Sequence, residues 1–204
     1  MRKFIYIGKE RKGDHFKNWD DFNELLSDAD EVVIELMSIY YDFLDELIDY
    51  IQSCNVKVSL VISAAYITSD EIAETILKCQ GHIEILFFSL NHRISAKMGG
   101  EEAYYESPNI FKVLKKAKTN NITVKTFICD NATAFLAKIT IEVFHHYKDV
   151  MDLYFVVDKT YDYEGSLDRL KLFVETSAVK TGDNEYDFRG LKVTFSDVLD
   201  EKNE

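Results

Sequence analysis

The chain has 204 residues, and its apolar fraction of 47% argues for one folded domain with a full-sized core and against intrinsic disorder. Its 36 acidic and 24 basic residues give a formal net charge of −12, so nucleic acid and an anionic membrane surface are not expected as partners. A basic or hydrophobic-basic peptide fits this charge better.

Two further features concern location and cofactors. No apolar run approaches the roughly 18 to 20 residues that span a bilayer, and the amino-terminal MRKFIYIGKERK lacks the apolar centre of a signal peptide. We therefore expect a cytoplasmic protein. Cys54, Cys79 and Cys129 are widely spaced and include no C-x-x-C pair, which predicts reduced thiols and neither a disulfide framework nor a zinc site. No metal and no cofactor are expected.

Apolar runs and helical periods alternate along the chain. The first strand is expected over Lys3–Ile7, and a helix over Asn18–Ser27. The apolar run from Glu31 to Met37 predicts a second strand, followed after a turn at Ser38 to Tyr41 by a helix over about Asp42–Ser53. Later strands are expected over Val56–Ile62, His82–Leu90, Ile122–Cys129 and Met151–Val157.

Three later helices carry start signals. Thr68 and Glu71 are spaced as a capping box, in which a hydroxyl and a carboxylate satisfy two backbone N–H groups. Ser107-Pro108 is typical of a cap followed by proline in the first helical turn. Asn131 is expected to cap a long helix. Between these signals, Asn91–Ser107 is expected to be the longest loop.

The carboxyl-terminal part is predicted to hold a helix over Ser166–Ser177 and a strand over Leu191–Phe195. The earlier strands begin about 25 to 40 residues apart, which is the length of one βα unit. Six such units predict an α/β fold with a parallel sheet, either doubly wound or a complete or partial barrel. In a partial barrel the last segment would cover the open edge, or that edge would pair with a second copy in a homodimer.

Three segments resemble those of radical S-adenosylmethionine (radical SAM) enzymes. They are EVVIELMSIYYDFLDELIDYIQSCNVKVSLVIS, HIEILFFSLN and GGEEAYYESPNIFKVLKKAKTNNITVKTFI, and together they span about Glu31 to Asp158. The resemblance implies the partial (β/α)6 TIM-type barrel of that family over residues 1–160. Residues 161–204 would then form a carboxyl-terminal helix and strand extension of the same single domain.

The chain departs from this family at both cofactor motifs. The family holds its iron–sulfur cluster with a C-x-x-x-C-x-x-C motif after the first strand, but Gly8 to Trp19 contains no cysteine. The family's Gly-Gly-Glu-Pro turn corresponds to Met37-Ser38-Ile39-Tyr40. The resemblance therefore implies a degenerate scaffold without radical SAM chemistry.

Any remaining site is expected at the carboxyl ends of the strands. The ligand-binding candidates are polar residues at or just after those ends: Ser38, Ser63, Ser89, Asn91 and Asn131. The catalytic candidates are the groups there that can exchange protons or attack a substrate: His92, Asp130, Asp158 and Cys129. The alternative interpretation is that these polar residues are ordinary turn and helix-cap residues, and that the thiol is simply buried.

Two functions of different classes remain. The first is a non-catalytic, radical-SAM-like barrel that serves as a binding or regulatory module for a peptide or protein partner. The second is a metal-independent enzyme that acts on a small molecule at the carboxyl-terminal mouth of the barrel. Loss of the cofactor motifs favours the first, and an acid–base pair among the strand-end residues would favour the second.

Overall fold

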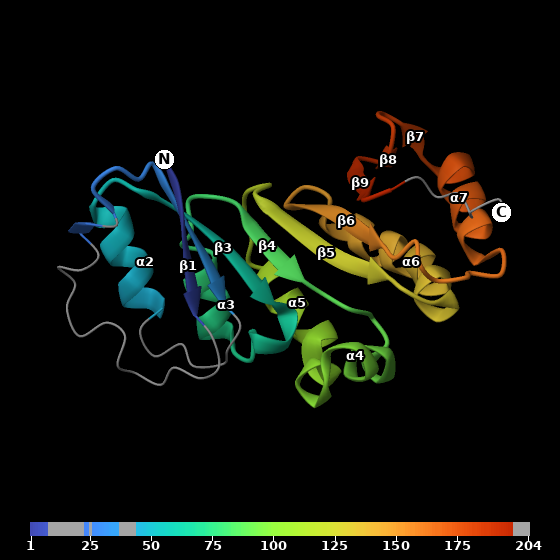
Figure 1. Ribbon diagram of the computed structural model, residues 1–204, viewed down its shortest axis with the longest axis horizontal. Coiled ribbons are helices and arrows are strands. Elements are labelled where there is room, and N and C mark those ends of the chain that lie inside the picture. The colour runs from blue at the N-terminus through green and yellow to red at the C-terminus, as the bar shows by residue number, and fades with distance from the viewer. Residues whose placement is uncertain (8–22, 25, 37–43, 198–204) are drawn as a thin grey trace.

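The computed structural model describes residues 1–7, 23–24, 26–36 and 44–197. Within these residues, nine strands form one sheet (Figure 1), in the order β1-β2-β3-β4-β5-β6-β9-β8-β7. Their bounds are β1 Arg2–Ile7, β2 Glu31–Leu36, β3 Lys57–Ser63, β4 Ile83–Leu86, β5 Ile122–Ile128, β6 Met151–Val157, β7 Val179–Lys180, β8 Glu185–Phe188 and β9 Leu191–Phe195.

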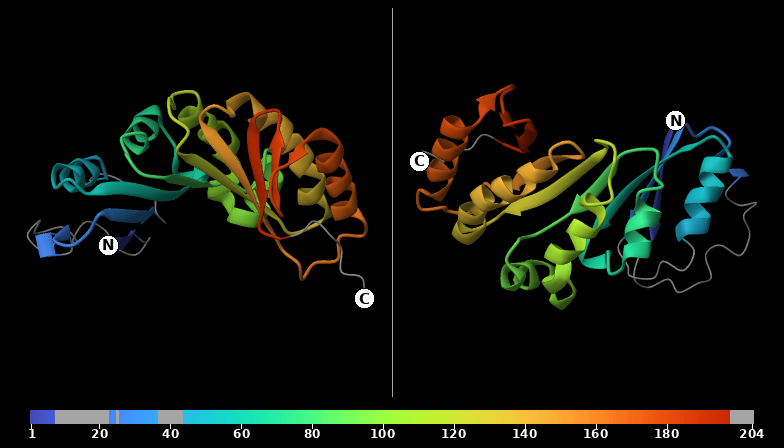
Figure 2. Two further views of the ribbon diagram at one scale, coloured as in Figure 1. Left: turned by 90° about the horizontal axis from the view of Figure 1, so that it is seen from above. Right: turned by 180° about the vertical axis from the view of Figure 1, so that it is seen from behind.

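Helices follow most of the strands and cover one face of the sheet. The α-helices are α2 Leu44–Ser53, α3 Asp70–Ile76, α4 His92–Gly99, α5 Glu106–Leu114, α6 Asn131–Phe144 and α7 Ser166–Ser177. The described residues also form three short 3-10 helices, η1 Ala64–Tyr66, η2 Glu101–Tyr105 and η3 His145–Tyr147. Figure 2 shows that α2, α3, α5 and α6 all lie on the same side of the strands.

In the described part of the chain, the strand order excludes two of the predicted arrangements, the doubly wound sheet and the closed barrel. Strands β1 to β6 are consecutive and parallel, and β9 is parallel to β6. A doubly wound sheet reverses its strand order at a switch point, and no such reversal occurs among β1 to β6. The sheet ends at β1 and β7, which are not paired with each other, so a closed barrel is excluded as well. The predicted α/β fold with a mainly parallel sheet is confirmed.

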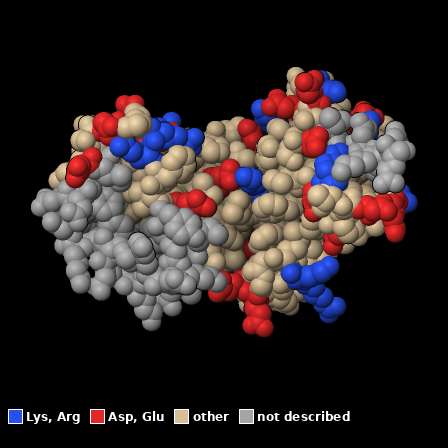
Figure 3. All heavy atoms as spheres, viewed as in Figure 1, with Lys and Arg blue, Asp and Glu red and all other residues tan. Residues whose placement is uncertain are grey.

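Burial in β4, β5 and β6 follows the two-residue alternation of a pleated strand. In β5 the residues beneath the helices are buried, and those on the opposite face, Thr123, Lys125 and Phe127, are partly exposed. On this second face the Lys125 ammonium lies 3.2 Å from the Glu84 carboxylate. Figure 3 shows the same face, with acidic and basic atoms side by side near its middle. The helix-covered side therefore holds most of the core.

The largest error in the predicted elements is the region 91–107. It was expected to be a loop, but it forms α4 and η2. The buried side of α4 is polar, because Ser95 is fully buried and donates to the Ser89 and Asn91 carbonyl oxygens. A helix whose buried residue is a serine shows little apolar periodicity, which explains the error.

The glycine pair ends α4 for steric reasons. A Cβ on Gly99 would lie 2.3 Å from a ring carbon of Phe88, so a larger residue would push α4 away from the end of β4. Gly100 has φ of +82°, a conformation that residues with a side chain rarely adopt. These two residues let the chain turn sharply from α4 into η2.

Three predicted helix starts are displaced. Helix α3 is capped by Ser69, whose hydroxyl accepts from Ile72 N, and not by Thr68. Helix α5 already begins at Glu106, before Ser107. Helix α6 is capped by Asp130, so Asn131 is its first residue and not its cap. In each case a neighbouring residue supplies the cap or the first turn.

The carboxyl-terminal extension also differs from the predicted single helix and strand. After α7 the chain forms three strands, of which β9 pairs with β6 and β8 pairs with both β9 and β7. Strands β7 and β8 contain two and four residues, too short for a clear alternation. The extension therefore continues the sheet beyond β6.

Candidate functional site

The carboxyl ends of β3 to β6 lie along one edge of the sheet, next to α4, η2 and the start of α5 (Figure 1). All but one of the predicted site residues are described in this region. The exception is Ser38, which lies outside the described residues, as do Gly8 to Trp19 and Met37 to Tyr40.

The polar residues that end β3 and follow β4 are hydrogen-bonded to nearby backbone. The Ser63 hydroxyl accepts from Ala65 N at 3.3 Å, and the Ser89 hydroxyl accepts from Asn91 N at 3.1 Å. The Asn91 side-chain oxygen accepts from Arg93 N at 3.0 Å and caps α4. These three ligand-binding candidates thus shape the turns at the sheet edge.

His92 lies in an aromatic group formed with η2. Its ring centroid is 4.6 Å from that of Tyr104, which is 4.9 Å from that of Tyr105. Within the described residues, no hydrogen bond joins His92 to Cys129, the thiol for which it was considered as a base. The structure therefore places His92 with aromatic residues of η2 and does not form the predicted Cys–His pair.

Asp130 begins α6 through a capping box. Its carboxylate accepts from Thr133 N at 2.8 Å, and Asp130 N donates to the Thr133 hydroxyl at 2.9 Å. The Lys97 ammonium of α4 lies 3.6 Å from the same carboxylate. Although burial alone would raise the pKa of Asp130, the hydrogen bonds from Thr133 and the charge of Lys97 lower it below its ordinary value.

Asp158 is similarly bound within its own turn. Its carboxylate accepts from the Thr160 hydroxyl at 2.7 Å and from Thr160 N at 2.9 Å. These two hydrogen bonds lower the pKa of Asp158. The buried Tyr163 hydroxyl lies 2.7 Å from the Ile128 carbonyl oxygen and 2.8 Å from that of Asp158. Tyr163 therefore joins the ends of β5 and β6.

The pKa directions do not favour proton transfer by these groups. Asp130 and Asp158 both have lowered pKa values, so both are ionised at neutral pH and neither has a proton to donate. Burial raises the pKa of the Cys129 thiol, and the negative charges of the two carboxylates add to that effect. A nucleophilic cysteine needs the opposite shift. The structure brings these three residues together without activating any of them.

Asn131 differs from the other candidates. It is partly exposed, but its side-chain oxygen is buried and accepts no hydrogen bond within the described residues. The sequence predicted that Asn131 caps α6, but Asp130 is the cap. No contact described here gives Asn131 a ligand-binding role.

Sequence reasoning missed Glu106, the fully buried acid of this region. One of its carboxylate oxygens, Oε1, accepts from Phe88 N at 2.9 Å and from Ser89 N at 2.7 Å, and so ties α5 to the residues after β4. The other oxygen, Oε2, is buried and accepts no hydrogen bond from the residues that the structure describes. The hydroxyl proton of nearby Ser95 is donated to carbonyl oxygens instead.

Burial raises the pKa of Glu106 to about 7, against the smaller opposing effects of Ser95 and of the two backbone N–H groups. A signal for this residue was present in the sequence. Glu106 falls on the same buried stripe as Ala103, Ile110 and Val113, at helical spacing. An acid on an apolar stripe is a candidate for burial.

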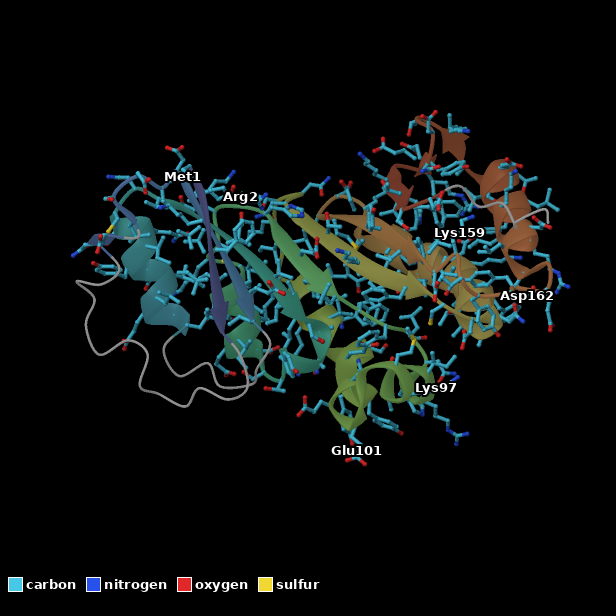
Figure 4. The ribbon with its side chains drawn as sticks, in the orientation of Figure 1. Met1, Arg2, Lys97, Glu101, Lys159 and Asp162 are labelled. Atoms are coloured by element: carbon cyan, nitrogen blue, oxygen red, sulfur yellow. The ribbon has the colours of Figure 1, made fainter. Side chains whose placement is uncertain are left out.

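A groove of about 660 Å³ lies between η1, η2 and α5, beside the end of β3. The residues that line it are Ala65, Thr68, Glu101, Glu102, Tyr105, Pro108, Asn109 and Lys112. Most of the surface inside is apolar, and the two glutamates and Tyr105 come from η2. Figure 4 labels Glu101, which projects from η2 at the edge of the molecule.

Hydrogen bonds hold the far wall of the groove in place. The Lys112 ammonium donates to the Thr68 carbonyl oxygen at 2.7 Å and to the Asn109 side-chain oxygen at 3.1 Å. The Asn109 amide donates to the Ala65 carbonyl oxygen at 3.4 Å, which is a long contact. Helix α5 is thereby linked to η1, and the groove between them is a preformed feature.

Comparisons with protein-family models, with curated proteins and with solved structures returned no match for this chain. Within the described residues, no group of three or more His, Cys, Asp or Glu side chains is arranged to hold a metal ion. In the same part of the chain, every helix is too short or too polar to cross a bilayer. The candidate site is therefore characterised only by the contacts and distances described above.

Proposed function

We propose that this chain is a non-catalytic binding or regulatory module, and that it holds a peptide segment of a partner in the groove between η1, η2 and α5. The observation that carries this proposal is the groove itself. Its volume of about 660 Å³ lies within the range of roughly 300 to 1,000 Å³ that is usual for ligand pockets. Its apolar floor and polar rim suit a peptide side chain and its neighbours.

We further propose that the scaffold is a partial (β/α)6 barrel of the radical SAM type that has lost its cofactor motifs. Consecutive parallel strands with their helices on one face and an unclosed sheet support this relationship. So does the order of the three segments that resemble the family. In a barrel of this kind, ligands bind at the carboxyl ends of the strands, and the groove lies beside such an end.

The enzymatic alternative has weaker support. A barrel-mouth enzyme would need an accessible acid and base with pKa values near the working pH. Glu106 has a pKa of about 7 but is fully buried. Asp130 and Asp158 are held as anions by hydrogen bonds to Thr133 and Thr160. Ser63, Ser89 and Asn91 accept hydrogen bonds from backbone N–H groups of their own turns. These residues have structural roles that account for their presence.

A peptide selection with a groove-filling variant tests the proposal. Thr68 lines the groove with an exposed side chain, and its carbonyl oxygen, which a substitution keeps, is the atom that Lys112 binds. We expect peptides selected from a displayed random library on the natural chain to lose binding to Thr68→Trp. Thr119→Trp is the matched control, because Thr119 is exposed after α5 and lies outside this groove.

The selection has a clear negative result. If no peptide is enriched, or if enriched peptides bind Thr68→Trp as tightly as the natural chain, the groove is not a peptide site and the proposal fails. Asp130→Asn and Asp158→Asn provide a second comparison. We expect both to retain peptide binding, since neither residue lines the groove.

A further inference from the structure

The rim of the groove combines carboxylates with an exposed aromatic ring. Glu101 and Glu102 are exposed, and Tyr105 is 64% exposed although it lines the groove. All three belong to η2, a 3-10 helix, in which side chains three residues apart lie on the same side. Glu102 and Tyr105 have this spacing. A carboxylate and the face of a phenol ring are therefore presented together at one end of the groove.

We propose that this end of the groove binds the guanidinium group of an arginine in the partner peptide. The planar cation would lie over the Tyr105 ring while its N–H groups donate to the Glu101 and Glu102 carboxylates. Aromatic faces attract cations, and guanidinium pairs with carboxylates through two parallel hydrogen bonds. This inference rests on the proposed peptide-binding function and names the chemistry that the groove selects.

The chain itself shows this kind of packing elsewhere. The guanidinium carbon of Arg189 lies 4.8 Å from the centroid of the Phe188 ring, and that of Arg2 lies 5.6 Å from the Phe4 ring. Arginine is preferred to lysine at the groove because a planar guanidinium can stack on an aromatic ring and also form two hydrogen bonds to a carboxylate. A lysine ammonium is instead a compact, strongly hydrated charge. The net charge of −12 also attracts a cationic peptide from a distance.

The groove lining also includes a positive charge. The Lys112 ammonium donates to the Thr68 carbonyl oxygen and to the Asn109 side-chain oxygen. A second positive charge on the peptide would meet this ammonium, so the segment that crosses Ala65 and Pro108 should be uncharged. The groove therefore selects one arginine followed or preceded by apolar residues, and disfavours a basic cluster.

The test uses synthetic peptide pools of the form acetyl-XXX-O-XXX-amide, in which X is a mixture of uncharged residues. The central position O is arginine, citrulline, leucine or glutamate. Citrulline keeps the shape of arginine and removes its charge. Binding is measured by fluorescence polarisation, and its location by backbone amide shifts of residues 101–107 and 109–112 in NMR spectra.

We expect the arginine pool to bind about tenfold more tightly than the citrulline pool, because only the charged guanidinium gains from both the Tyr105 ring and the carboxylates. The variant Glu101→Gln/Glu102→Gln should lose that preference, and Tyr105→Leu should reduce it. The charge-matched control is Asp168→Asn/Glu175→Gln, which removes two exposed acids of α7 far along the chain. The control should keep the preference within about twofold.

The possible outcomes separate this inference from the proposed function. Equal binding of the arginine, citrulline and leucine pools, with amide shifts in the groove, overturns the arginine inference and leaves peptide binding intact. Equal loss in the η2 variant and in the α7 control also overturns it, because the preference would then reflect the overall charge. If no pool binds, the proposed peptide-binding function fails.

Discussion

Glu106→Gln is the most informative single substitution, because it changes the charge of a fully buried group and little else. The carboxylate accepts from two backbone N–H groups through one oxygen, and the other oxygen is buried without a partner in the described part of the chain. Glutamine keeps an oxygen that can accept from Phe88 N and Ser89 N. It also remains neutral at every pH.

The magnitude follows from the pKa of Glu106, which burial raises from 4.5 to about 7. This difference of about 2.5 pKa units corresponds to about 3 kcal/mol between the two protonation states. The folded state holds the proton more tightly than the unfolded chain. The contribution of Glu106 to stability is therefore fully present below about pH 4.5 and is lost as the pH rises to about 7.

The assay is urea unfolding of the natural chain and of Glu106→Gln at several pH values from 4.5 to 8.5. The difference between the two unfolding free energies isolates Glu106 from the other carboxyl groups. We expect Glu106→Gln to gain about 3 kcal/mol relative to the natural chain over this range. The control Glu175→Gln changes an exposed acid on α7 and should show no comparable trend.

A difference that stays constant with pH would refute this reasoning. It would mean that Glu106 is ionised in the folded chain throughout, with its unpartnered oxygen solvated or otherwise satisfied. Glu106→Ala provides a further check, because it removes the acceptor as well as the charge. It should be less stable than Glu106→Gln at every pH, since both variants are uncharged here and only in Glu106→Ala do Phe88 N and Ser89 N lose their partner.

Three other substitutions test structural roles, each by urea unfolding. Asp130→Ala removes the capping box of α6 and should lower the unfolding free energy by about 1 kcal/mol at neutral pH. This loss should shrink as the pH falls through the lowered pKa of Asp130. An equal loss in acid would contradict the role of the Asp130 charge. Gly99→Ala should cost about 1 to 3 kcal/mol, because its Cβ meets the Phe88 ring, whereas the exposed neighbour change Lys97→Ala should cost much less. Tyr163→Phe should cost about 1 kcal/mol by removing the hydroxyl between the Ile128 and Asp158 carbonyl oxygens, and an unchanged stability would show that water replaces it.

Elements with a strong apolar period were predictable from the sequence. Helix α2 buries Leu44, Leu47, Ile48 and Ile51 at helical spacing and ends at the predicted residue, Ser53. Strand β6 has the predicted bounds Met151–Val157. In both cases hydrophobic burial alone specifies the element, and the sequence displays that burial directly.

Elements whose burial is polar were not predictable in this way. Helix α4 buries a serine and approaches Phe88 through a glycine, so nothing in its apolar pattern distinguishes it from a loop. The displaced caps have a different cause. Asp130 and Asn131 are both good capping residues, and only the position of the Thr133 hydroxyl decides between them.

The candidate site was predictable as a region and not as a set of residues. The polar strand-end residues do gather at one edge, but their hydrogen-bond partners decide their roles. Ser63 and Asn91, for example, accept from backbone N–H groups two or three residues further along the chain. The groove depends on η2, a segment that was expected to be loop, so its lining could not be read from the sequence.

The consecutive strand order also determines how the molecule can open. Strand β1 lies at the end of the sheet and pairs with β2 alone, so it can separate without disturbing any other pair of strands. In a doubly wound sheet the first strand is central, and its loss would divide the sheet. Here amide exchange should slow progressively from β1 towards β4 and β5, which have partners on both sides. Strand β1, like β7 at the other end of the sheet, is thus a place where unfolding of this fold can begin.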